Sequence, residues 1–102
     1  MNQPPPLPRA RLVEVLRAFK EQRAVEYHLT ALGHFGSYAR DEARVDSDID
    51  IVFDTDMPNL FLTAMLKQDL EAWLGRPVDV LQARGLTNAR LRERIEREAV
   101  YV

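Results

Sequence analysis

The chain has 102 residues, which is the size of one small domain. Charged residues make up 29% of it and the formal net charge is −2, so the overall charge gives no attraction to nucleic acid. The absence of cysteine excludes disulfides and thiolate metal sites and fits a reducing compartment. No apolar run is long enough to span a membrane and no secretion signal is visible, so we expect a cytoplasmic protein without membrane association.

The N-terminal segment, residues 1–8, contains four prolines, which predicts an extended lead-in before a single domain over residues 9–102. Apolar residues at helical spacing predict a first helix over residues 8–23. The face of this helix that we expect to be buried carries Leu12, Val15, Leu16 and Phe19.

Three later segments are predicted to be strands. Residues 27–35 are mostly apolar and end at a Gly-Ser pair, whereas residues 48–53 and 77–81 place acidic residues between β-branched ones. Between the first two strands, we expect a short helix over residues 37–40 and a polar loop over residues 41–47.

Two more helices are predicted, over residues 59–74 and 87–98, and Gly75 is placed to end the first of them. Their expected apolar stripes are Leu62, Met65, Leu66, Leu70 and Trp73 in the first, and Leu91, Ile95 and Ala99 in the second. Strands that alternate with helices predict an α/β (α+β) fold, a small mixed β-sheet with helices packed on it.

Asp48 and Asp50 alternate with isoleucines at the start of the second predicted strand. Alternate side chains of a strand share a face, so both carboxylates should leave one face while the isoleucines enter the core. Two neighbouring anions repel unless a cation or a proton neutralises one of them, and carboxylate oxygens suit Mg²⁺ or Mn²⁺. The alternative is a solvated strand entry, because the Asp-x-Asp pattern is common.

Asp79 lies between Val78 and Val80 in the third predicted strand. The valines should face the core, which directs the carboxylate to the opposite side. If this strand pairs beside residues 48–53, the aspartates of both strands can converge on one face. If it does not, Asp79 is a solvated acid on an edge strand, and the residues alone leave both interpretations open.

Gly36 and Ser37 follow the first predicted strand. Glycine lets a backbone approach a ligand closely, and a serine that opens a helix exposes N–H groups that favour phosphate. The alternative is an ordinary glycine turn with a serine cap. Arg40 and Arg44 could each reach phosphate oxygens, and we favour Arg40 because it lies one turn beyond Ser37. For Arg44, a solvated loop arginine remains an equal alternative.

The combination is more specific than its parts. Gly-Ser, ten residues, Asp-x-Asp and a strand aspartate about thirty residues further on resemble the DNA polymerase β-like nucleotidyltransferase superfamily. The local sequence GSYARDEARVDSDIDIVF is most similar to its minimal nucleotidyltransferase (MNT) branch, which supplies antitoxins paired with HEPN-domain toxins. The resemblance extends to the closing LRERIEREAVYV, and Tyr38 stands where many relatives have arginine or threonine.

This resemblance implies a nucleotidyltransferase fold and a role for each motif residue. Gly36 and Ser37 would hold the triphosphate of ATP. Asp48 and Asp50 would ligate two divalent ions, Mg²⁺ or Mn²⁺, and Asp79 would share one ion and help activate the acceptor hydroxyl. The expected reaction is transfer of AMP to a tyrosine of a HEPN RNase toxin, which neutralises the toxin.

Two other functions stay open at this stage. One is a nucleotidyltransferase that modifies a hydroxyl of a small molecule. The other is a non-catalytic antitoxin that acts only by binding, although the presence of all the motif residues argues against it. We interpret His28 and His34 as structural residues and Trp73 as a core residue.

Overall fold

The computed structural model describes residues 7–40, 43 and 48–102. Most of the predicted lead-in and most of the predicted polar loop, including Arg44, lie outside the described residues. The chain order is α1, β1, β2, α2, β3, a short 3₁₀ helix η1, α3 and β4. Among the described residues, no helix combines the length and the apolarity that crossing a membrane requires.

The sheet has the strand order β3-β2-β1-β4. Strand β1 is antiparallel to β2 and to β4, whereas β2 and β3 are parallel. The predicted small mixed sheet is therefore confirmed. The strands are β1 (Leu29–Phe35), β2 (Ile49–Thr55), β3 (Val78–Gln82) and β4 (Val100–Tyr101).

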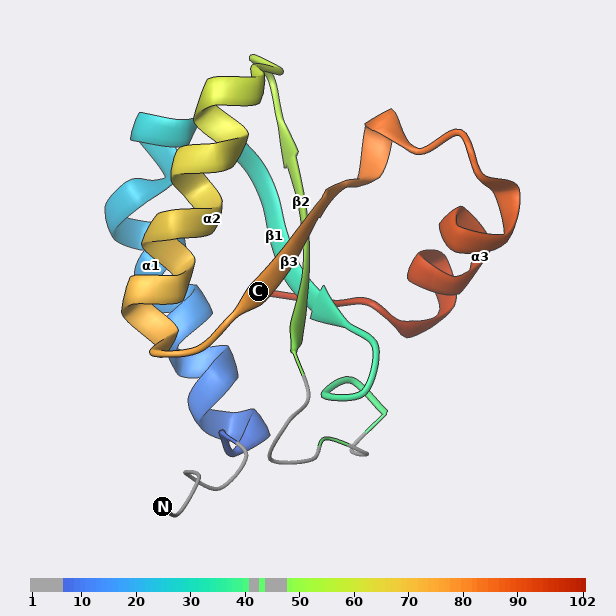
Figure 1. Ribbon diagram of the computed structural model, residues 1–102, viewed down its shortest axis with the longest axis horizontal. Coiled ribbons are helices and arrows are strands. Elements are labelled where there is room, and N and C mark those ends of the chain that lie inside the picture. Colours follow the sequence, from blue (N-terminus) through green and yellow to red (C-terminus); the bar gives the residue numbers. More distant parts are fainter. Residues whose placement is uncertain (1–6, 41–42, 44–47) are drawn as a thin grey trace.

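The helices cover both faces of the sheet. Figure 1 shows α1 (Arg9–Tyr27) and α2 (Leu60–Leu74) side by side on one face, and α3 (Ala89–Glu98) on the other. The 3₁₀ helix η1 (Ala83–Gly85) leads from β3 toward α3. Each face of β2 is thus covered by a helical layer, so each of its two side-chain rows meets a different environment.

The larger core lies between the sheet and the helices α1 and α2. The face predicted for α1 is confirmed, because all four of its apolar residues are buried. In α2 the prediction is wrong for Met65, whose side chain is 48% exposed, because the helix rests on the sheet through Leu66, Leu70 and Leu74. Trp73 is a core residue as predicted and meets the ring of Phe19 edge-on, with 5.1 Å between the ring centroids.

A smaller core lies between the sheet and α3. Its buried residues are Phe35, Val52 and Ile95, and its partly buried residues include Leu81, Leu91 and Ala99. The apolar face predicted for α3 is therefore confirmed. This second core fixes α3 above the middle of β2, with one flank of the helix turned toward the start of that strand.

The element boundaries differ from the sequence predictions for local reasons. Helix α1 continues past residue 23 to Tyr27, whose ring is buried and whose hydroxyl donates to Asp69 of α2. Helix α2 begins after Asn59, which accepts hydrogen bonds from two backbone N–H groups, so Pro58 precedes the cap. Gly75 ends α2 in the left-handed conformation, as predicted.

Candidate active site

Asp50 and Asp79 lie opposite each other in the parallel pair of β2 and β3. The neighbouring pairs, Ile49 with Val78 and Ile51 with Val80, point into the core beneath α1 and α2. Because side chains alternate along both strands, the two aspartates leave the opposite face, the face covered by α3. The structure therefore places two of the three predicted aspartates side by side, half-buried Asp50 next to exposed Asp79.

Asp48 precedes β2, which begins at Ile49, and its side chain is exposed. The pleat of the strand therefore does not fix the direction of the Asp48 side chain, although the alternation had predicted that it would. Asp48 still acts on Asp50 electrostatically, because its charge contributes to the raised pKa of that carboxyl group. The three predicted acids are thus in one region, with Asp50 in the central position.

The pKa of Asp50 is raised above its ordinary value of 3.8, first by burial and then by the charge of Asp79. The positive charges of Arg94 and Arg40 oppose this rise. A carboxylate that is partly removed from water beside other carboxylates is stabilised by a cation or a proton. A divalent cation bound here would offset the repulsion between these carboxylates.

Gly36 contacts the Asp50 carboxylate directly. It follows Phe35, the residue of β1 that pairs with Asp50, and its φ is +78°. A methyl group added to its Cα would overlap an Asp50 carboxylate oxygen. Only glycine satisfies both the positive φ and the close approach, so the turn after β1 lies against the acidic group.

The turn over residues 36–40 corrects the expectation of a helix opened by Ser37. Residues 36–40 form a turn, in which the N–H of Arg40 donates a helical hydrogen bond to the carbonyl of Gly36 at 3.0 Å. Tyr38 anchors this turn, because its ring is buried and its hydroxyl accepts from the N–H of Leu7 at 3.3 Å. The described residues therefore form a tight backbone turn beside Asp50 in place of the predicted helix.

Arg40 is bound to Glu98 at the end of α3. Its Nη1 lies 3.3 Å and 3.1 Å from the two carboxylate oxygens of Glu98. Arg94 donates from Nε to the same carboxylate at 3.2 Å. Burial raises the pKa of Glu98, but the two arginines outweigh this effect and hold the pKa below its ordinary value.

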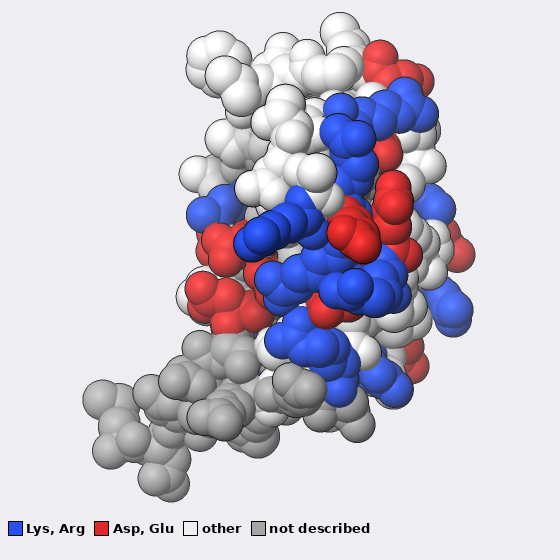
Figure 2. Space-filling view, turned by 90° about the vertical axis from the view of Figure 1, so that its right-hand side faces the viewer, with Lys and Arg blue, Asp and Glu red and all other residues white. Residues whose placement is uncertain are grey.

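The sequence reasoning missed Arg94 and Glu98. Their spacing of four residues on a helix is the signal that could have found them, since it places them next to each other beside the apolar face. Figure 2 shows basic side chains gathered over the α3 side of the molecule, interleaved with acidic ones. The arginines of η1 and α3 are Arg84, Arg90, Arg92, Arg94 and Arg97.

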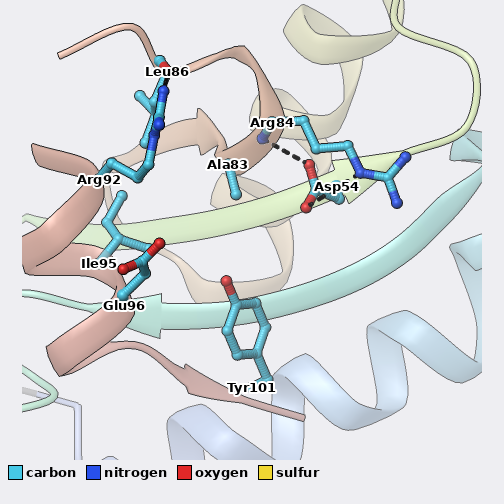
Figure 3. Close-up of a pocket in the computed structure, with 8 residues that line it drawn as sticks. All are labelled: Asp54, Ala83, Arg84, Leu86, Arg92, Ile95, Glu96 and Tyr101. Carbon is cyan, nitrogen blue, oxygen red and sulfur yellow. Dashed lines mark hydrogen bonds and ion pairs between the residues drawn. The ribbon is translucent and has the colours of Figure 1, made fainter. Parts of the chain in front are cut away.

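A hollow of about 430 Å³ lies on the opposite flank of α3, between that helix, η1 and the sheet. Figure 3 shows Tyr101 of β4 directing its hydroxyl toward the middle of this space, with Asp54 of β2 and Glu96 of α3 around it. None of the predicted site residues lines it. We therefore place the candidate active site at Asp50 and Asp79, where the carboxylates meet.

The donor chemistry fits a divalent cation, because hard cations prefer carboxylate oxygens. Within the described residues, however, no three His, Cys, Asp or Glu side chains are gathered closely enough to form a ready metal cluster. Asp50 and Asp79 provide the paired part of such a site. Asp48, outside the strand, would have to turn toward them.

Residues 12–102 match the family described as the nucleotidyltransferase domain, and the chain belongs to this family. Among its relatives, the protein adenylyltransferase MntA of Thermococcus cleftensis is 37% identical over 89 residues, which are 86% of this chain and 89% of that protein. A Methanocaldococcus jannaschii protein that also bears the name protein adenylyltransferase is 44% identical over 69 residues, 67% of this chain and 73% of its own.

Solved structures agree with this assignment. A protein described as a minimal nucleotidyltransferase shares the fold with a TM-score of 0.70 and 40% identity, over 86% of this chain and 93% of its own. A toxin–antitoxin complex with AMP-PNP gives a TM-score of 0.68 at 23% identity, over 93% and 72%. A tri-AMPylated Shewanella oneidensis HEPN toxin in complex with an MNT antitoxin gives 0.59 at 21%, over 91% and 66%. The last two likenesses concern the fold alone.

Proposed function

We propose that the chain is an antitoxin that transfers AMP from ATP to a tyrosine hydroxyl of a HEPN RNase toxin and so neutralises it. The observation that carries the proposal is the register of Asp50 with Asp79, together with the contact between Gly36 and the Asp50 carboxylate. Membership of the nucleotidyltransferase family supports the chemistry. The names of the relatives support AMP as the transferred group and a protein as the acceptor.

In this reaction the acceptor hydroxyl oxygen attacks the α-phosphorus of ATP. The bond from that phosphorus to the bridging oxygen breaks, and pyrophosphate leaves. Asp48, Asp50 and Asp79 would hold Mg²⁺ or Mn²⁺, two ions if the site is complete, and these ions supply neutralisation of the charge that develops on the phosphate oxygens. The backbone turn at Gly36 and Ser37, with Arg40, would hold the triphosphate in place.

Asp79 is the residue we assign to the acceptor. Its side chain is exposed, whereas Asp50 beside it is half-buried. A hydroxyl that arrives from another molecule can therefore reach Asp79 first, and an ionised carboxylate can accept the proton that the hydroxyl loses. This exposure favours a macromolecular acceptor, whose hydroxyl can approach Asp79 from solvent.

The proposal is tested by incubating the chain with Mg²⁺, ATP labelled at the α-phosphate and the protein encoded by the adjacent gene. We expect label on a tyrosine of that protein, and no label when the ATP is labelled at the γ-phosphate. Label on a small molecule and never on protein would instead favour a small-molecule nucleotidyltransferase. Complex formation without any label transfer would favour a non-catalytic antitoxin.

A further inference from the structure

Glu98 joins two arginines from distant parts of the chain beside the candidate active site. Arg94 lies four residues before it on α3, and Arg40 ends the turn that begins at Gly36. The Glu98 side chain is only 15% exposed, and it accepts from both guanidinium groups. The Glu98 carboxylate therefore positions two guanidinium groups at the same end of β2 as Asp50.

The geometry of α3 separates Arg94 from the other arginines of the helix. Ile95 packs on the sheet between the two flanks of α3. At 100° per residue, Arg94 and Glu98 fall on the flank toward Asp50, whereas Arg92 falls on the flank that lines the hollow near Tyr101. Arg97 projects away from the sheet and is exposed.

Arg94 uses only its Nε in the hydrogen bond to Glu98. Within the described part of the chain, its two terminal nitrogens donate no hydrogen bond. A guanidinium group held by one edge presents the other as a fixed fork, which matches two oxygens of a phosphate group. The side chain is 43% exposed, so a ligand can reach that fork from solvent.

The charges around Arg94 favour an anion that is bound to a divalent cation over a bare anion. Among the described residues here, the four carboxylates of Asp48, Asp50, Asp79 and Glu98 face the guanidinium groups of Arg40 and Arg94. A bare anion would meet repulsion from the aspartates, whereas a polyphosphate with a divalent cation would pair with both sets of groups.

We propose that Arg94, positioned by Glu98, binds the polyphosphate tail of the nucleotide, the part that leaves as pyrophosphate. This inference rests on the proposed function and adds to it a phosphate-binding residue on α3. The tail rather than the α-phosphate is its ligand because Glu98 ties Arg94 to Arg40, on the side where the turn at Gly36 lies.

The experiment measures the affinity of the full-length chain for Mg²⁺-ATP, Mg²⁺-tripolyphosphate and AMP by calorimetry. Arg94→Gln should weaken binding of ATP and tripolyphosphate about tenfold and leave the affinity for AMP within about twofold. Arg94→Lys, which keeps the charge but loses the fork, should fall between wild type and Arg94→Gln. Glu98→Gln should also lower the ratio of the affinity for ATP to the affinity for AMP.

Arg97→Gln is the matched control, because it removes the same charge from the outer side of the same helix. It should leave all three affinities unchanged. Equal losses in Arg94→Gln and Arg97→Gln would overturn the inference, because the effect would then be one of general charge. Equal losses of ATP and AMP binding in Arg94→Gln would also overturn it. A wild-type chain that binds none of the three ligands would instead overturn the proposed function.

Discussion

Gly36→Ala perturbs the contact between the turn and Asp50 with a single methyl group. Gly36 has a φ of +78°, which costs an L-residue about 1–2 kcal/mol. The new methyl group would also overlap the Asp50 carboxylate and push that side chain away from its preferred rotamer, at about 0.5–1.5 kcal/mol. We therefore expect the free energy of unfolding to fall by about 1.5–3.5 kcal/mol.

Gly75 provides the matched control. Its φ is +69°, and a methyl group added there would meet no atom within 4 Å. Gly75→Ala should therefore cost only the conformational part, about 1–2 kcal/mol. The difference between the two variants isolates the contact with Asp50, and urea denaturation of both proteins measures it.

A double-mutant cycle makes the test stricter. In an Asp50→Ala background the carboxylate is gone, so the cost of Gly36→Ala should fall to that of Gly75→Ala. The reasoning is refuted if Gly36→Ala costs no more than Gly75→Ala in the wild-type background. It is also refuted if the cost of Gly36→Ala stays the same after Asp50 is removed, because the strain would then come from another source.

Three further predictions concern stability. Burial and the charge of Asp79 raise the pKa of Asp50, so folding disfavours its ionised form. Without divalent cations, Asp50→Asn should therefore melt no lower than wild type at pH 7, and a lower melting temperature would contradict this. His34 is buried without a hydrogen-bond partner among the described residues, and burial, followed by the charge of Arg9, lowers its pKa. Wild type should therefore lose stability as the pH falls through about 6.5. His34→Leu should gain about 1 kcal/mol and flatten that loss in urea titrations at pH 7.5 and 5.5, whereas an unchanged slope would exclude His34 as its cause. Asp69→Ala should cost about 2 kcal/mol in the same assay, because it leaves the buried Tyr27 hydroxyl without its acceptor and removes one of the two carboxylates that bind Arg23. A cost near zero would show that water replaces the Asp69 carboxylate.

Periodicity was sufficient to predict most of the fold. The alternation around Asp50 and Asp79 predicted that both leave one face of the sheet, and the structure pairs them. The spacing of Leu91 and Ile95 predicted the face on which α3 packs. These features succeed because burial of a repeating apolar row decides the orientation of a strand or a helix.

Features fixed by tertiary contacts could not be predicted in this way. Strand β4 has only two residues, and it forms because Val100 and Tyr101 lie against β1 at Gly33, where a side chain would collide with them. The turn after Gly36 was predicted as a helix because a serine cap is a local signal, whereas the buried Tyr38 that holds the turn is not.

Arg94 and Glu98 illustrate the same limit at the candidate site. In the sequence they form an ordinary pair four residues apart, as on many exposed helices. Their place beside Asp50 depends on how α3 crosses the sheet, which the second core determines. The roles of Asp48, Asp50, Asp79, Gly36, Ser37 and Arg40 in catalysis and nucleotide binding stay predictions.

The most direct test of the account is a paired measurement of ATP affinity and AMP transfer for Asp79→Asn, with Asp48→Asn beside it. An asparagine in place of Asp79 could neither accept the proton of the hydroxyl nor hold a cation beside the attacking oxygen, so Asp79→Asn should bind Mg²⁺-ATP nearly as wild type does and transfer AMP poorly. Asp48→Asn should lose both binding and transfer. Near-normal transfer by Asp79→Asn would contradict the account and leave Asp79 as a solvated acid on an edge strand.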